Sequence, residues 1–210
     1  IMWMSKQTDD IVREWSARGL DGEFRARTGV RNDSYFSAGK IAWLLRNVPG
    51  VRDRAERGEL AIGTPDVWLL WNLTGGTAHR IEPSAASRTA LLNIHRAEWD
   101  VDLCAMLDIP LSLLPELVSS DAHFGDLDPG VLPGSSSSPV PVTAILGDQM
   151  AGLYGQACLE TGSTKNTFGT AGVLTANVGN SPAIMDGMSS SVAWKIGSEV
   201  AYEAEGVVFH

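Results

Sequence analysis

The stretch Tyr35-Phe-Ser-Ala-Gly-Lys-Ile-Ala-Trp-Leu-Leu-Arg-Asn47 carries the clearest structural pattern in this chain of 210 residues. From Lys40 to Asn47 its large apolar residues recur at helical spacing and predict one broad buried face, made by Ile41, Trp43, Leu44 and Leu45. Pro49-Gly50 follows directly and ends the helix, because proline lacks an N–H donor and glycine permits a tight turn. The stretch therefore predicts a helix packed into a core.

The residues on either side predict a strand and two further helices. Ile1-Met-Trp-Met4 is wholly apolar and predicts a buried strand. Thr8 is the predicted N-cap of an amphipathic helix whose inward residues are Ile11, Trp15 and Leu20. Thr64-Pro65 favours the start of another helix, since proline presets φ at the first helical position, and Gly75-Gly76 ends it.

The pattern changes to strands in the last third of the chain. Val140 to Leu146 predicts an apolar strand that runs into Gly147-Asp148-Gln149 and a helix over 150–158. The segments 163–168 and 173–178 alternate around Gly169-Thr-Ala-Gly172, which is typical of a β-hairpin. The serine-rich segment 133–139 is expected to form a surface loop. Strand, helix and hairpin in this order predict an α/β domain over 1–159 and a second domain over 160–210.

Composition excludes several classes of partner. The net charge of −9 and the pI near 4.8 argue against nucleic acid and against an anionic membrane, because an acidic surface repels phosphate. The two cysteines, Cys104 and Cys158, lie in separate apolar helical patterns, so we expect buried reduced thiols rather than a disulfide. No run reaches the roughly 18 apolar residues of a membrane span, and a cytoplasmic location is expected.

Asp148 is the first candidate for chemistry. It lies where an apolar strand ends and a helix begins, which is the edge of an open α/β sheet at which ligands collect. A carboxylate there could accept the proton of a hydroxyl group. The alternative is that Asp148 only caps the helix, because aspartate is a preferred N-cap residue.

The glycine turn and two aromatic residues are further candidates. Gly169 and Thr170 begin a turn whose backbone amides could approach phosphates closely, although such turns are common in ordinary hairpins. Trp3 and Tyr35 could wall a small polyol with apolar faces and a hydroxyl, or belong to the core. No two histidines show the spacing of helical metal ligands, so a histidine metal site is not expected. Ser87-Arg88-Thr89 could bind an anion or form an ordinary turn, and receives no role.

Taken together, several of these blocks resemble the FGGY carbohydrate kinases. Tyr35 to Asn47 fits the first signature of that family at every specified position. Further similar blocks are 63–75, 86–89, 92–95, 98–100, 114–116 and 165–170. The resemblance implies an actin-like ATPase fold, related to ribonuclease H, of which this chain holds most of the N-terminal lobe and the start of the C-terminal lobe. Residues 1–159 would belong to the substrate-binding domain without its first strands, and residues 160–210 would begin the nucleotide-binding domain.

The resemblance also implies an activity, its cofactors and its residues. The expected reaction is ATP-dependent phosphorylation of a polyol hydroxyl, with glycerol as the first acceptor and Mg²⁺ as the metal. Asp148 would be the general base and would also face the magnesium ion through water. The expected substrate-binding residues are Trp3, Tyr35, Asp148, Gln149 and Val173, and the expected phosphate contacts are Gly169 and Thr170. The parent enzyme is expected to be a homo-oligomer.

Departures from the family pattern keep alternatives open. Val173 stands where family members often have a phenylalanine, so erythritol or a ketopentose such as xylulose stays within reach. The family's N-terminal Asp-Gly-Thr phosphate loop, its Arg-Glu polyol pair and its glycine-rich adenosine motif have no counterpart in this sequence. We therefore expect the chain to be the middle piece of a longer enzyme and inactive by itself. A non-catalytic protein that keeps the kinase fold is the remaining alternative, favoured by the missing motifs and by the changes at Ser5, Gln7 and Val173.

Overall fold

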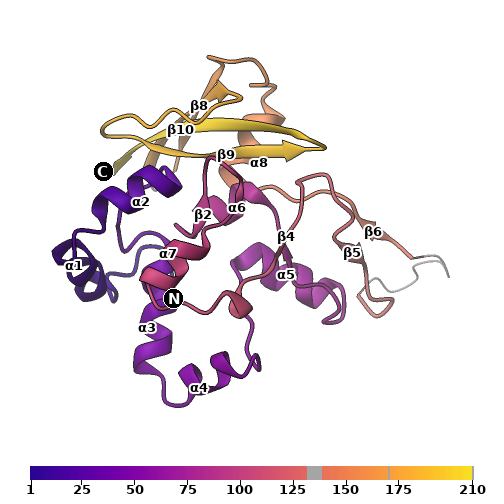
Figure 1. Cartoon of the computed structure of the whole chain (residues 1–210). Helices are drawn as coiled ribbons and strands as arrows, with labels where there is room; N and C mark the ends of the chain where they lie inside the picture. Colours follow the sequence, from indigo (N-terminus) through magenta and orange to yellow (C-terminus); the bar gives the residue numbers. More distant parts are fainter. Residues whose placement is uncertain (132–138, 170, 210) are drawn as a thin grey trace.

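The computed structural model describes residues 1–131, 139–169 and 171–209 (Figure 1). Helices α1 to α4 and α7 gather on one side of the molecule, and a four-stranded sheet lies across the top of the view, with α6 below it and α8 behind it. The predicted surface loop over 133–139 falls outside the described residues except for Pro139, and so does Thr170. Within the described residues, no helix combines the length and apolar character that crossing a bilayer requires.

The elements follow one another along the chain as short helices with two-residue strands between them, and the long strands come last. The helices are α1 (Asp9–Ala17), α2 (Asp21–Thr28), α3 (Ser37–Asn47), α4 (Val51–Glu56), α5 (Pro65–Leu73), α6 (Pro83–Ser87), α7 (Val101–Met106), a 3-10 turn (Leu111–Leu113) and α8 (Asp148–Gly155). The strands are β1 (Arg80–Ile81), β2 (Leu92–Asn93), β3 (Glu98–Trp99), β4 (Glu116–Leu117), β5 (Gly125–Asp126), β6 (Pro141–Val142), β7 (Thr164–Phe168), β8 (Ala171–Gly179), β9 (Ser189–Ile196) and β10 (Glu199–Phe209).

The helix predicted from the opening stretch is present as α3, and its face packs into the larger of the cores. Ile41 and Leu45 are buried in this core. Trp15 of α1 and Phe24 of α2 are buried in the same core, with their ring centres 5.6 Å apart. Leu20 packs against the same core in partly buried form. The predicted inward residues are confirmed at Ile11 and Trp15 of α1 and at Ile41 and Leu45 of α3, because apolar residues four positions apart share one helix face. Trp43 and Leu44 are only partly buried, and Leu20 lies beyond the end of α1 at Ala17.

Two strand predictions are corrected. Ile1 to Met4 is not a buried strand: Trp3 and Met4 form a turn, and the four side chains are 43% to 60% exposed. A strand needs a neighbour for its N–H and C=O groups, and no described residue pairs with this segment. The strand expected over 140–146 is only β6, two residues that pair with β5, and residues 143–146 continue without strand pairing. Helix α8 begins at Asp148 and ends at Gly155, slightly earlier than expected.

The β-hairpin is confirmed, and it belongs to a larger sheet. Strands β7 and β8 pair antiparallel around the glycine turn, with Thr167 opposite Val173. The full strand order is β7-β8-β10-β9, and every pair is antiparallel. Val207 of β10 lies opposite Val173 on the other side of β8. Residues far apart in sequence thus lie side by side in one row across the sheet, from Thr167 of β7 through Val173 to Val207.

Two small cores join the sheet to the helices that precede it. Val192 and Tyr202 pack with Ala85 and Ala86 of α6, and Ala193 and Trp194 pack with Met150 and Leu153 of α8. Burial of these side chains is the main stabilising contribution that fixes both helices on the sheet. Both cysteines are free and buried, as expected. The expected domain boundary at 159/160 lies between α8 and β7 and stays a prediction.

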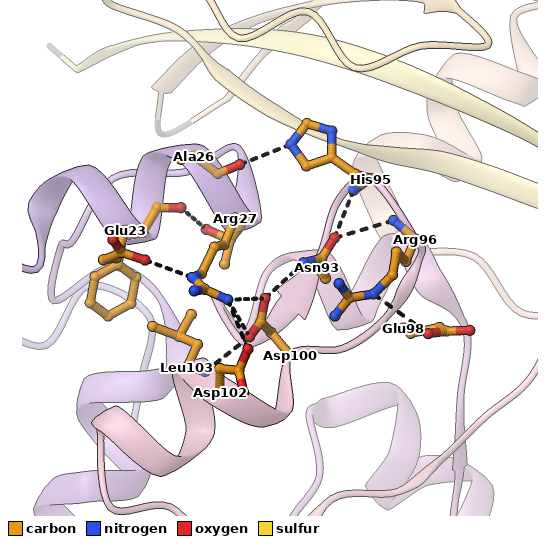
Figure 2. Close-up of polar contacts among 12 residues, drawn as sticks. Glu23, Ala26, Arg27, Asn93, His95, Arg96, Glu98, Asp100, Asp102 and Leu103 are labelled. Carbon is orange, nitrogen blue, oxygen red and sulfur yellow. Dashed lines mark hydrogen bonds and ion pairs between the residues drawn. The ribbon is translucent and has the colours of Figure 1, made fainter.

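A buried carboxylate holds the helical part together (Figure 2). Asp100 caps α7 by accepting from the Leu103 amide at 2.9 Å, and it accepts from the Asn93 side chain at 2.8 Å and from Arg27 at 3.2 Å. Burial alone would raise the pKa of Asp100, but these three donors together bring it below its usual value. The blocks around Asn93 and Asp100 therefore serve the fold rather than the candidate site described next.

Candidate active site

The described candidate residues meet around one cavity of about 750 Å³. Its lining includes Trp3, Tyr35, Asp148, Gln149, Gly169 and Val173. These residues come from the N-terminal segment, the approach to α3, the start of α8 and the β7–β8 hairpin, so only the folded chain brings them together. Thr170 lies outside the described residues. Trp3 and Tyr35 touch edge to face with ring centres 5.5 Å apart, which makes them one aromatic wall.

Asp148 stands at the cavity as the first residue of α8. The N-cap position is Gly147, so Asp148 is not the capping residue, although it lies in the first turn where the helix dipole favours a carboxylate. Its Oδ1 accepts from the Gln149 amide at 2.8 Å. The side chain is exposed and lines the cavity, where it can receive a proton from a bound hydroxyl group.

The loop before Asp148 is held by a buried carboxylate that the sequence did not single out. Glu82, fully buried, accepts from the Ala85 amide at 2.7 Å, from Ser120 Oγ at 2.9 Å and from both the amide and the hydroxyl of Ser84. Burial raises the pKa of Glu82, and these donors oppose the rise. Because the Ser84 proton points at Glu82, its oxygen is free to accept from the Gly147 amide at 3.1 Å. The backbone next to Asp148 is thereby fixed to α6.

Replacing Ser84 tests this link directly. We expect Ser84→Ala to speed hydrogen exchange at the Gly147 amide and to lower the free energy of unfolding by about 1–2 kcal/mol, because a buried acceptor is lost. Amide exchange measured by NMR and a urea titration check both. Ser181→Ala, at an exposed serine, is the control and should change neither. An unchanged exchange rate at the Gly147 amide in Ser84→Ala would show that the Ser84 contact does not hold the loop before Asp148.

Arg88 and Glu205 form another wall of the cavity, although no role was predicted for Arg88 from the sequence. Arg88 Nη2 donates to Glu205 Oε1 at 2.7 Å and to the Tyr35 hydroxyl at 3.4 Å. Its guanidinium lies over the rings of Tyr35 and Phe36, 5.4 and 5.3 Å from their centres. Arg88 therefore orients Tyr35 through contacts with both its hydroxyl group and the face of its ring. The sequence offered one clue to this role, since a buried arginine usually has a carboxylate partner. That partner is Glu205, which lies 117 residues away along the chain.

Glu203, two residues before Glu205 on β10, is a buried acid without a hydrogen-bond partner. Within the described part of the chain, neither of its oxygens meets a donor. The pKa of Glu203 rises from 4.5 to about 8, mainly because the group is buried and partly because the Glu205 carboxylate is near. Arg88, and to a smaller extent the nearby Ser191 hydroxyl and Lys165, oppose the rise without cancelling it. At neutral pH the protonated form of Glu203 therefore predominates in the folded chain.

This shift makes stability depend on pH. The folded state holds the Glu203 proton more tightly than the unfolded state, so the contribution of Glu203 to the free energy of unfolding is greatest below pH 4.5 and is lost as pH rises through about 8. Glutamine cannot ionise, so Glu203→Gln should be more stable than the wild type by about 2–4 kcal/mol at pH 8, with little difference near pH 4. Urea titrations at several pH values check this against the exposed Glu199→Gln. Parallel pH profiles for wild type and Glu203→Gln would contradict the expectation.

The cavity has some of the features that a nucleotide phosphate and a magnesium ion require. A Cβ added to Gly169 would meet nothing within 4 Å, so the turn leaves space beside its backbone. No group of three or more His, Cys, Asp or Glu that could hold a metal occurs among the described residues. Asp148 alone suits Mg²⁺, which commonly uses one or two carboxylates together with water and substrate phosphates.

Comparison with solved structures defines the class of protein. The glycerol kinase of Plasmodium falciparum, solved with ADP, superposes with a TM-score of 0.93 at 30% identity, over 100% of this chain and 42% of that one. The xylulose kinase of Rhodospirillum rubrum gives 0.80 at 20% identity, over 96% and 39% of the two chains, and shows the fold alone. The fold is thus the α/β fold of the actin-like ATPases, as the sequence predicted.

Residues 1–155 match the N-terminal domain of the FGGY family of carbohydrate kinases, and the chain belongs to that family. It is similar to a curated glycerol kinase of Thermus brockianus, with 47% identity over 210 residues, which are 100% of this chain and 42% of the relative. The chain thus spans about two fifths of the length of the curated relatives it matches. The resemblance seen in the sequence motifs is confirmed.

Proposed function

We propose that the complete protein to which this chain belongs phosphorylates a polyol hydroxyl with ATP and that glycerol is its acceptor. The observation that carries the proposal is the convergence of Asp148, Gln149, Tyr35 and Trp3 on one cavity beside the glycine turn of the β7–β8 hairpin. The similarity to glycerol kinases over the whole chain supports the choice of acceptor.

In the proposed reaction Asp148 accepts the proton of the acceptor hydroxyl. As that proton leaves, the hydroxyl oxygen forms a bond to the terminal phosphorus of ATP, and the bond from phosphorus to the bridging oxygen breaks to release ADP. Such a transfer needs little covalent help, so positioning and charge neutralisation dominate the rate. Asp148 would hold a magnesium ion through water, and the ion would supply part of that charge neutralisation.

The remaining lining residues have binding roles in this proposal. Trp3 and Tyr35 cover the carbon atoms of the polyol, Gln149 hydrogen-bonds a hydroxyl, and Gly169 with Thr170 contacts the phosphates. Val173 leaves more room than a larger apolar side chain would, so a longer acceptor is the second candidate. The proposal places this chemistry in the cytoplasm, in a homo-oligomer, with the substrate-binding domain ending near residue 159. The chain by itself is expected to be inactive.

A substrate panel tests the proposal. Protein expressed from the complete reading frame is assayed with ATP, Mg²⁺ and glycerol, erythritol or xylulose, and ADP release is measured. We expect the highest kcat/KM for glycerol. A preference for erythritol or xylulose would reassign the acceptor within the family. No phosphorylation of any acceptor would reject the enzyme and favour a binding protein that keeps the fold.

A further inference from the structure

A buried lysine contacts the side chain of Gln149 from behind the cavity wall. Lys165 of β7 is only 4% exposed, and its stem runs along α8 beside Gly152. Its ammonium donates to Gln149 Oε1 and, at 2.8 Å, to Thr167 Oγ1. The Thr167 hydroxyl donates to the same Gln149 oxygen at 3.3 Å. Gln149 and Thr167 line the cavity, whereas Lys165 does not.

These contacts determine the orientation of the Gln149 side-chain amide, that is, where its oxygen and its NH₂ group lie. A lysine ammonium has three donors and no acceptor, so only the oxygen of Gln149 can face it. Burial lowers the pKa of Lys165, and the nearby carboxylates of Glu205, Asp148 and Glu203 favour its charged, purely donating form. The Gln149 oxygen thus already receives two donors, and the NH₂ group remains for a ligand.

We propose that Lys165 is a positioning residue that sets Gln149 as a hydrogen-bond donor toward the cavity and so selects a ligand oxygen that accepts at this point. The proposal rests on the function proposed above and deepens it. The neighbouring Asp148 is an acceptor, so the two adjacent side chains offer opposite halves of a hydrogen-bond pattern. A hydroxyl group satisfies both, because it donates one proton and accepts through its lone pairs.

The pattern makes a specific demand on substrate analogues. A glycerol analogue with one terminal hydroxyl replaced by fluorine is neutral and small, and its fluorine accepts weakly but never donates. In the wild type the fluorine can face the Gln149 NH₂ group. If the amide turned its oxygen to the cavity, two acceptors would meet, and an unpaired buried polar group costs binding.

The experiment measures dissociation constants for glycerol and this fluoro analogue by calorimetry, using protein from the complete reading frame. We expect Lys165→Met, which keeps much of the stem but no donor, to raise the ratio of the fluoro constant to the glycerol constant about tenfold, because the amide is free to turn. Lys195→Met removes a lysine from β9 that does not line the cavity and should keep the wild-type ratio.

A second variant tests the donating end of Gln149 directly and remains available if Lys165→Met does not fold. Gln149→Glu leaves Lys165 in place and presents only acceptors to the cavity, so it too should raise the ratio about tenfold. A wild-type ratio in folded Lys165→Met would overturn the role of Lys165, and a wild-type ratio in Gln149→Glu would overturn the donating role of Gln149 on which that role depends. Wild-type protein that binds no glycerol would instead reject the proposed function, and this inference with it.

Discussion

Asp148→Asn is expected to lower kcat for glycerol phosphorylation by about 10²–10⁴-fold, which corresponds to roughly 3–5 kcal/mol in the activation barrier. Asparagine has the same shape, and its oxygen can still accept from the Gln149 amide, so the start of α8 should be unchanged. KM for glycerol should change far less than kcat, because the proton acceptor is needed as the new bond forms rather than for binding.

Steady-state kinetics with the complete protein check this result. Asp126→Asn is the matched control, because it is the same aspartate-to-asparagine change at a residue that does not line the cavity. Asp126 lies on β5 and contacts His123. Its kcat should stay at the wild-type value. A kcat for Asp148→Asn within about threefold of the wild type would remove Asp148 from the role of general base.

The second large effect concerns the wall of the same cavity. Arg88→Ala should lower the free energy of unfolding by about 3–5 kcal/mol, because removal of one partner leaves a buried charge unpaired. The Glu205 side chain is 3% exposed and has Arg88 at 2.7 Å. The loss of the guanidinium from the faces of Tyr35 and Phe36 adds to the effect. For a chain of this size the thermal midpoint should fall by roughly 10 °C.

Arg57→Ala provides the control for a charge pair of similar geometry at the surface. Arg57 donates to Glu59 at 2.6 Å, but both side chains are largely exposed, so its removal should cost less than about 1 kcal/mol. Thermal unfolding of the three proteins side by side measures the difference. Equal midpoints for Arg88→Ala and Arg57→Ala would mean that the buried pair contributes no more than a surface pair.

The sequence predicted best those features that neighbouring residues specify. The helix around Ile41 and Leu45 and the hairpin around Gly169 depend on periodicity and turn chemistry within about ten residues, and both are present. The sequence failed for Ile1 to Met4, where apolar composition alone suggested burial. A strand exists only with a hydrogen-bonding neighbour, and composition says nothing of where that neighbour lies.

Some residues of the candidate site were predicted from family motifs in the sequence, and others were found only from contacts in the structure. The motifs named Asp148, Gln149 and Tyr35, and these three residues do line one cavity. No local pattern pointed to Glu82, which acts on Gly147 through Ser84, and Arg88, which contacts Tyr35, was considered only as a possible anion contact and received no role. Both roles were missed because the contacts that create them, from Ser84 to Gly147 and from Arg88 to Glu205, join residues 63 and 117 positions apart along the chain.

By itself the sequence determined the family, the order of the main elements and the residue types available for chemistry, because these follow from short-range patterns. Only the tertiary structure decided how those residues are oriented. It buried Lys165 behind Gln149 and Arg88 beside Glu205, and it anchored the loop before Asp148 to α6. The physical reason is that a hydrogen bond or ion pair depends on distance and desolvation in space, which separation along the chain does not specify.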